Sequence, residues 1–364
     1  MVGIIYNMTY LCPHGCSICC VDSVKIKENG ENIEIYTNAL SNKTVFARNS
    51  KPLYVQAADY LHSLGMELSF NEKLKLFDNL DIKNLEMQIS GGDALLLDDN
   101  MNFLKMLSEK IGKRNLSLVT TSKGIRKEDI QEISSYISQY NCAYDNPYKN
   151  KNLNYRSDGY VSENLHIAKE FLKSGISVQA ECVLTRDNMR PELLNDLYLS
   201  LHNEGINNLL LMRIIPFIGR NTDQENVPTN LEYRSSINAL RELEQKYTYP
   251  KINLICSLKY LYPDELTENP CQMSKNVMGL TPSGKLLLSP YAFGIGNKPL
   301  DEYFEIGSLV DNKLSRLLEN PIRQEIIKRH GENIGHCKIQ SYLYSNKPNF
   351  IDRILDTTDP LYKL

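Results

Sequence analysis

Residues 12–19 read Cys12-Pro13-His14-Gly15-Cys16-Ser17-Ile18-Cys19 and place three thiols in a C-x3-C-x2-C spacing. The run follows a short apolar stretch, residues 2–10, which predicts a strand that leads directly into the cysteines. Three thiolates this close together can bind three irons of a cubane cluster and leave the fourth iron without a protein ligand. An iron with an open position can take part in chemistry, whereas a fully ligated cluster mainly stores or passes electrons. The spacing therefore predicts a metal centre at Cys12, Cys16 and Cys19.

A zinc site, or three unrelated buried thiols, is the alternative interpretation of this run. Structural zinc sites use four ligands, usually from two C-x2-C pairs or from cysteines combined with histidines. His14 lies within the run, but no second pair follows it, and the side chain of Cys20 points away from that of its neighbour Cys19. The number of ligands therefore favours an iron–sulfur cluster over zinc.

The composition limits the compartment and the partners. The chain has 364 residues, a net charge of -3 and a pI near 6.1, so it has no general attraction for nucleic acid or for an anionic membrane. No run of 18 apolar residues and no signal peptide is present in the sequence, and we expect a cytoplasmic protein. In a reducing compartment, nine cysteines indicate metal binding or free thiols and not a disulfide framework.

Strand-like and helix-like segments alternate through about residue 215. The strands are expected at residues 3–8, 85–90, 116–121, 141–144, 176–185 and 208–215. The helices are expected at residues 53–64, 71–80, 100–111, 127–139, 162–174 and 190–204. Strands separated by helices of this length predict βαβ units and a parallel sheet, and six units favour a partial α/β barrel. We assign the partial barrel to residues 1–220, with a polar insertion at 23–51 that is expected to form a hairpin. A long loop is expected at residues 145–161.

The pattern changes after Pro216. A linker through residue 230 is followed by a predicted helix at 231–246, by β-like runs at 251–256, 276–281 and 285–289, and by helical patterns at 313–318 and 321–330. This order predicts a small α+β domain over residues 221–364.

The cysteine run resembles the C-x3-C-x-Φ-C motif of the radical S-adenosylmethionine (SAM) superfamily, with Ile18 at the position that is commonly aromatic. The resemblance implies a 4Fe–4S cluster that binds SAM at its open iron and cleaves it reductively. The product, a 5′-deoxyadenosyl radical, abstracts hydrogen from a substrate. The cofactors supply this chemistry, while the protein orients them.

Four further segments resemble motifs of the same superfamily, in the same order. Ser90, Gly91, Gly92 and Asp93 resemble its G-G-E segment, whose backbone meets the amino group of SAM. Thr120, Thr121 and Ser122 match a turn whose hydroxyls lie near the ribose or the carboxylate, although an ordinary hydroxyl-rich strand end is an equal alternative. Val183 and Leu184 match a segment that meets adenine, and residues 213–220 match its last-strand P-x-x-G-R segment. Glu181 and Arg156 are candidates for polar contacts to SAM.

The C-terminal region resembles the start of a SPASM or twitch extension, a domain that holds auxiliary clusters. Cys271 and Gly284 have the expected separation, but Ser289 stands where a second cysteine belongs, and a hydroxyl is a poorer iron ligand than a thiolate. Cys256, Cys271 and Cys337 supply at most three ligands to one cluster. We therefore expect a degenerate domain with a reduced set of auxiliary clusters or none.

Enzymes of this kind mostly modify peptides, and a ribosomally made peptide is the expected substrate, with epimerisation or cross-linking as the expected reaction. A reductant such as flavodoxin or ferredoxin is an implied partner. Epimerisation needs a hydrogen donor, for which Cys142 and Cys182 are candidates, although a free cysteine is more often a small buried hydrophobe. The alternatives are a radical SAM enzyme acting on a nucleoside, sugar or amino acid, and a non-enzymatic iron–sulfur or zinc protein.

Overall fold

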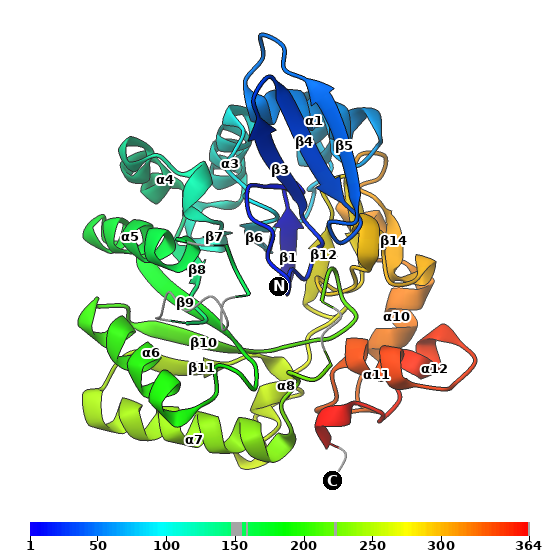
Figure 1. Ribbon diagram of the computed structural model, residues 1–364. Coiled ribbons are helices and arrows are strands. Elements are labelled where there is room, and N and C mark those ends of the chain that lie inside the picture. Colours follow the sequence, from blue (N-terminus) through cyan, green and yellow to red (C-terminus); the bar gives the residue numbers. More distant parts are fainter. Residues whose placement is uncertain (147–154, 158, 222–223, 363–364) are drawn as a thin grey trace. The chain divides into compact units, whose positions relative to one another are not determined.

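The computed structural model describes residues 1–146, 155–157, 159–221 and 224–362 (Figure 1). These residues fall into two compact units. The first unit comprises residues 1–138, 217–221 and 273–324, and the second comprises residues 139–216, 222–272 and 325–364. The chain enters each unit more than once, so each contains segments that are far apart in the sequence. The domain boundary at residue 220 stays a prediction.

The sheet of the first unit is built around its first strand. Its strands are ordered β7-β6-β1-β12-β13-β14. Their bounds are β1 Val2–Asn7, β6 Leu85–Ser90, β7 Leu116–Val119, β12 Val277–Leu280, β13 Lys285–Leu287 and β14 Glu305–Ser308. β1 is parallel to β6 on one side and to β12 on the other, whereas β12, β13 and β14 pair antiparallel. Strand β1 is thus held on both edges, and the chain that leaves it starts from a fixed point.

The insertion after the cysteines supplies three strands of a small separate sheet, and the start of the cysteine run supplies the fourth. This sheet has the order β2-β3-β4-β5, with β2 Leu11–Cys12, β3 Val24–Asn29, β4 Asn32–Thr37 and β5 Asn42–Ala47. The expected hairpin is confirmed as β3 and β4, which are joined at Gly30, whose φ of 62° suits glycine. The third antiparallel strand was not predicted, nor was the short pairing of Leu11 and Cys12 with Val24 and Lys25.

The helices of the first unit include α1 Leu53–Ser63, α2 Phe70–Asp78, α3 Asp98–Ile111, α4 Ile130–Tyr136 and α9 Leu314–Leu317. Helix α2 begins at a capping box in which Ser69 and Glu72 bond each other's backbone N–H groups. The helix predicted to run to Gln139 is wrong at its end. Ile137 is already extended, and Gln139 begins the next strand.

The sheet of the second unit is entirely parallel in the order β8-β9-β10-β11. Its strands are β8 Gln139–Ala143, β9 Ser177–Leu184, β10 Asn208–Arg213 and β11 Lys251–Leu254. The intervening helices are α5 Tyr160–Lys173, α6 Pro191–Asn203 and α7 Asn230–Tyr247. This βαβ pattern, together with the parallel strands of the first unit, confirms the predicted α/β class. Much of the loop expected at 145–161 lies outside the described residues.

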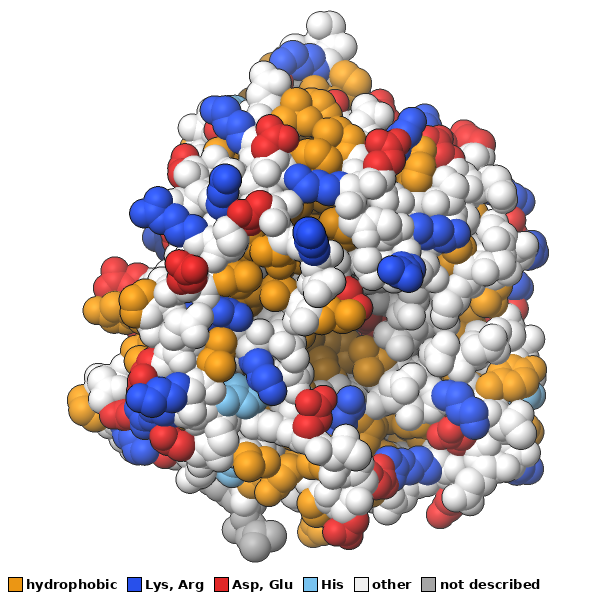
Figure 2. All heavy atoms as spheres, turned by 180° about the vertical axis from the view of Figure 1, so that it is seen from behind, with side chains coloured by type: hydrophobic (Ala, Val, Ile, Leu, Met, Phe, Trp, Pro, Cys, Tyr) orange, Lys and Arg blue, Asp and Glu red, His pale blue; other side chains and the backbone are white. Residues whose placement is uncertain are grey.

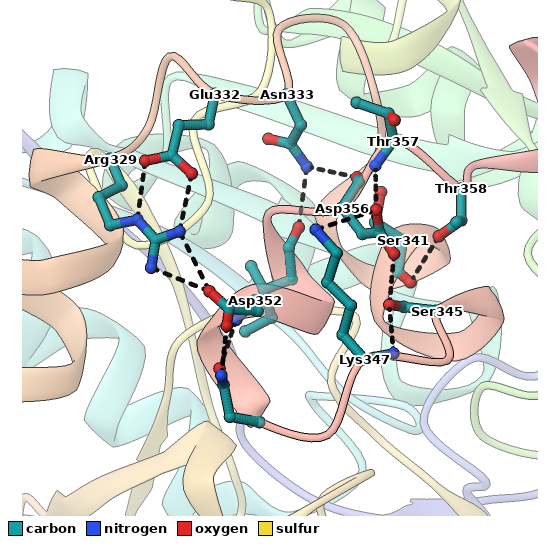
Figure 3. Close-up of polar contacts among 12 residues, drawn as sticks. Arg329, Glu332, Asn333, Ser341, Ser345, Lys347, Asp352, Asp356, Thr357 and Thr358 are labelled. Atoms are coloured by element: carbon teal, nitrogen blue, oxygen red, sulfur yellow. Dashed lines mark hydrogen bonds and ion pairs between the residues drawn. The ribbon is translucent and has the colours of Figure 1, made fainter.

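The C-terminal part of the second unit is held by polar contacts and a buried ion pair. Its helices are α8 Cys256–Lys259, α11 Lys338–Tyr344 and α12 Phe350–Ile354, and α10 Pro321–Lys328 crosses the division between the units. Figure 3 shows Arg329 bridging Glu332 and Asp352, and Ser345 donating to Asp356.

Arg213, at the end of β10, anchors the C-terminal tail through Asp359. Its guanidinium makes two bonds of 2.7 Å to that carboxylate, and both side chains are almost fully buried. Burial by itself would raise the pKa of Asp359, but Arg213 and the N–H groups of Leu361 and Cys337 hold it below its ordinary value.

We predict that Arg213→Met destabilises the protein by about 3–5 kcal/mol, because it leaves a buried carboxylate without its partner. Urea unfolding at pH 7 measures this loss. Since the pKa of Asp359 is lowered in the fold, the ion pair's contribution is present above about pH 4 and is lost as the pH falls below it. The difference in unfolding free energy between variant and wild type should therefore become smaller in acid.

The control is Arg241→Met, which breaks an exposed ion pair with Glu265 and should lower the unfolding free energy by about 1 kcal/mol or less. Equal effects of the two variants would contradict the prediction.

Candidate functional site

The cysteine loop, residues 12–23, begins at β2, a few residues after β1 ends. The thiols of Cys12 and Cys16 are buried, that of Cys19 is half-buried, and none of the three forms a disulfide. The pKa of the Cys12 thiol is raised, first by burial and then by the negative charges of Asp93, Cys16 and Cys19. Ile18, at the position that is commonly aromatic in the motif, is half-buried.

The chemistry of the donor set suits an iron–sulfur cluster. Among the described residues, no group of three or more His, Cys, Asp or Glu side chains forms a site for a metal ion. The irons of a cubane are separate atoms, so thiols that ligate different irons need not converge on one point. Three thiols on one short loop are the soft ligands that iron–sulfur clusters take.

The Gly91-Gly92 turn after β6 packs directly on the chain that leads into the cysteine loop. Gly92 N–H donates to the carbonyl of Thr9 at 2.7 Å, and Asp93 N–H donates to that of Leu11 at 2.8 Å. A Cβ on Gly92 would lie 2.2 Å from the Leu11 carbonyl oxygen, and one on Gly91 would lie 2.5 Å from that of Thr9. The sequence predicted that these glycines allow close approach to SAM. The close approach in the structure is to the protein's own backbone, and it fixes Cys12 beside the end of β6.

Asp93 is fully buried and ties the end of β6 to the end of β7. Its carboxylate accepts hydrogen bonds from the hydroxyls of Thr120 and Thr121 and, at 2.9 Å, from the N–H of Gly124. Burial raises its pKa to about 6, and these hydrogen bonds oppose the rise. Both threonine hydroxyls therefore donate to Asp93, whereas the sequence placed them near the ribose or carboxylate of SAM. Ser122 follows, half-buried, in the turn Ser122–Gly124.

The candidates in the second unit lie along β9. Glu181 is half-buried, and burial raises its pKa to about 7, opposed by Arg156 and assisted by Asp145. Arg156 forms an ion pair with Asp145, which also accepts the N–H of Val183 at 2.9 Å. Leu184 is fully buried.

Sequence reasoning missed Asp145 and Asn188, which hold the end of β9. The side-chain amide of Asn188 donates to the Val183 carbonyl at 2.8 Å, and its oxygen accepts the N–H of Thr185 at 2.9 Å. Asn188 also donates to the Asp145 carbonyl at 3.2 Å. The backbone atoms of Val183 that were predicted to meet adenine thus have partners within the protein. The adjacent Asp187 and Asn188 after a strand, residue types that are common in turns, were the available clue.

Cys142 and Cys182 lie on the helix-covered face of their sheet. Cys142 alternates with Tyr140, which stacks on Phe171 of α5, and with Tyr144, which bonds Ser200 of α6. In register, Cys142 stands opposite Ala180, two residues before Cys182, so both thiols share that face. Both are fully buried, which raises the pKa of Cys142 to about 12 and also that of Cys182. This placement favours core packing, and their role as hydrogen donors stays an untested prediction.

Three further cysteines, Cys256, Cys271 and Cys337, lie in the second unit. Burial and then the charges of Cys337 and Cys271 raise the pKa of Cys256, so these three thiols are electrostatic neighbours. Lys338, fully buried beside them, has a pKa lowered by burial. The expectation of a reduced set of auxiliary clusters, or none, stays a prediction.

The surface and the helices add two observations. Figure 2 shows Lys and Arg side chains interspersed with Asp and Glu over the visible face. Within residues 1–146, 155–157, 159–221 and 224–362, none of the helices combines the length and the hydropathy that a membrane span requires.

The fold is similar to that of two solved proteins. anSMEcpe with bound AdoMet (SAM) superposes with a TM-score of 0.60 at 14% identity, over 90% of this chain and 83% of that one. SuiB of Streptococcus suis bound to S-adenosylmethionine superposes with a TM-score of 0.62 at 14% identity, over 97% of this chain and 71% of SuiB. SuiB bound to its precursor peptide SuiA superposes with a TM-score of 0.61 at 15% identity, over 89% of this chain and 66% of SuiB. The fold is that of anSMEcpe and SuiB. No protein-family model and no curated protein matches the sequence.

We predict that Gly92→Ala displaces the cysteine loop, because its Cβ would overlap the Leu11 carbonyl. Overpacking of this kind costs about 1–3 kcal/mol. The expected result is a lower melting temperature and fewer irons retained per chain after anaerobic reconstitution. Gly331→Ala, where nothing lies within 4 Å, is the matched control. Wild-type iron content in Gly92→Ala would show that the contact does not position the thiols.

Proposed function

We propose that this protein is a radical SAM enzyme. The observation that carries the proposal is the packing of the Gly91-Gly92 turn against Thr9–Leu11. This packing sets a loop of three cysteines at the carboxyl ends of two adjacent parallel strands. Ligands of α/β proteins bind at this edge of a sheet. The similarity in fold to anSMEcpe and SuiB, both solved with SAM, supports the proposal.

The proposal assigns one set of residues to the cluster and another set to SAM. Cys12, Cys16 and Cys19 would ligate a 4Fe–4S cluster. Once bound, such a cluster supplies the electron that cleaves SAM to a 5′-deoxyadenosyl radical, which then abstracts hydrogen from the substrate. The residues proposed to bind SAM are Ile18, Ser90, Gly91, Gly92, Asp93, Thr120, Thr121, Ser122, Arg156, Glu181, Val183 and Leu184. Asp93, Thr120 and Thr121 would also hold the two strand ends in position.

The proposed substrate is a ribosomally made peptide, modified by epimerisation or cross-linking. SuiB was solved with its precursor peptide, and 89% of this chain superposes on 66% of SuiB. A reductant such as flavodoxin or ferredoxin would supply the electron. A degenerate SPASM or twitch-like C-terminal region remains part of the proposal.

The test of SAM chemistry is anaerobic reconstitution with iron and sulfide, followed by dithionite and SAM. We expect about four irons per chain and release of 5′-deoxyadenosine. Alanine at Cys12, Cys16 or Cys19 should abolish that release, because two thiolates do not hold the cluster. Cys271→Ala, matched in chemistry and also buried, should leave it intact. A colourless protein loaded with zinc would refute the proposal, as would full activity in any of the first three variants.

The substrate class is tested separately by incubating the reduced enzyme with candidate peptides encoded near its gene, in heavy water. Deuterium at a peptide Cα identifies epimerisation, and a loss of two mass units identifies cross-linking. If peptides stay unchanged while a nucleoside, sugar or amino acid consumes SAM, the peptide assignment is wrong.

A further inference from the structure

Arg220 lies buried against the cysteine loop and bonds it at four places. Its side chain, 5% exposed, donates from Nε to Asp22 at 3.1 Å, from Nη1 to the Cys16 carbonyl at 3.0 Å, and from Nη2 to the Ser23 carbonyl. Its own N–H donates to the Cys19 carbonyl at 2.8 Å. One planar guanidinium thus spans the loop from its second cysteine to its last residue, a geometry that the single ammonium of a lysine does not reproduce.

Asp22 joins the loop to two more segments of the first unit. It is 1% exposed, and its carboxylate accepts the N–H of Ala39 at 3.0 Å and that of Gly296 at 2.7 Å, in addition to Arg220. Asp22 also has a φ of 48°, in the left-handed region that residues other than glycine adopt infrequently. The end of the cysteine loop is therefore bound to segments 38–40, 217–221 and 295–297.

Gly219 shows how closely the Arg220 segment approaches the loop. A Cβ on Gly219 would lie 2.3 Å from the Cys19 carbonyl oxygen, and the residue has a φ of 52°. Its N–H donates to the Phe293 carbonyl at 2.7 Å. The backbone at Cys19 is thus in direct contact with a segment 200 residues later in the chain.

The contacts of Arg220 and Asp22 place Ser23 against a sulfur. The Ser23 N–H donates to Cys19 Sγ at 3.3 Å, and its hydroxyl oxygen lies 3.3 Å from the same atom. A cysteine that ligates iron has no proton to give, so the Ser23 hydroxyl would be the donor to Cys19 in the cluster-bound protein. Ser23 is buried, and its carbonyl is one of the two that the Arg220 guanidinium binds.

We infer that Ser23 sets the reduction potential of the cluster through two hydrogen bonds to Cys19, and that Arg220 and Asp22 are positioning residues that hold Ser23 there. The inference rests on the proposed function. Hydrogen bonds to the sulfurs are among the factors that set the potential of an iron–sulfur cluster. A donor stabilises the reduced cluster more than the oxidised one, because the reduced cluster carries more negative charge. Removing a donor therefore makes the potential more negative.

The experiment is a potentiometric titration of the reconstituted protein, followed by the electron paramagnetic resonance signal of the reduced cluster. Ser23→Ala should retain the iron content of the wild type and titrate at a more negative potential. Arg220→Lys keeps a positive charge beside Asp22 but loses the bonds to the two carbonyls, so it should shift the potential in the same direction and retain fewer irons. Arg48→Lys, in an exposed pair with Glu28 in the same unit, is the control and should match the wild type.

The outcomes separate this inference from the proposed function. A wild-type protein that takes up no cluster overturns both. A wild type that binds the cluster and cleaves SAM, beside a Ser23→Ala variant with an unchanged potential, overturns only the role of Ser23. Should Arg220→Lys fail to fold, Ser23→Ala alone still decides the question.

Discussion

The backbone contact between the Gly91-Gly92 turn and Thr9–Leu11 is the constraint on which the site depends. Strand β1 is held by β6 and β12, and this turn then bonds the chain just beyond β1. Because neither glycine has a Cβ, two polypeptide segments approach within hydrogen-bond distance of each other. The first cysteine follows immediately, so its position is set by the core of the first unit and not by a freely moving loop.

Asp93 extends the same constraint to the next strand. A buried carboxylate costs free energy unless it is hydrogen-bonded, and here Thr120, Thr121 and Gly124 supply the donors. The end of β6 is therefore held in a fixed position beside the end of β7. Asp93, which the motif presents as a ligand contact, also supports the surrounding backbone.

Local patterns predicted the local structure well. β6 matches its predicted bounds, since Leu85, Met87 and Ile89 alternate as buried residues and Gly91 ends the run. The pairing of β1 with β12, about 270 residues later, has no signal in the local pattern, because any short apolar run fits a parallel neighbour equally well. The roles of Asp22 and Arg220 could not be predicted for the same reason. Their hydrogen bonds join the cysteine loop to segments 38–40, 217–221 and 295–297. Hydrogen bonding between segments far apart in the sequence leaves no periodic pattern of residues. For Cys142, the strand was identified but its face was not, since the polar Asn141 within it obscures the alternation.

A loop that ligates a cluster through three thiols places an unusual demand on its scaffold. A fourth protein ligand would fix the cluster from another side, but an open iron excludes one, so the loop itself must be rigid. Ordering each residue of a loop costs about 1–2 kcal/mol in backbone entropy. In this chain the opposing contribution comes from Arg220 and Asp22, whose bonds reach the loop's carbonyls and three neighbouring segments. The Arg220–Asp22 ion pair is buried, and both side chains also form hydrogen bonds with backbone groups. These additional hydrogen bonds offset the cost of burying the two charges. The end of the P-x-x-G-R segment is therefore as much a part of the proposed cluster site as the cysteines that define it.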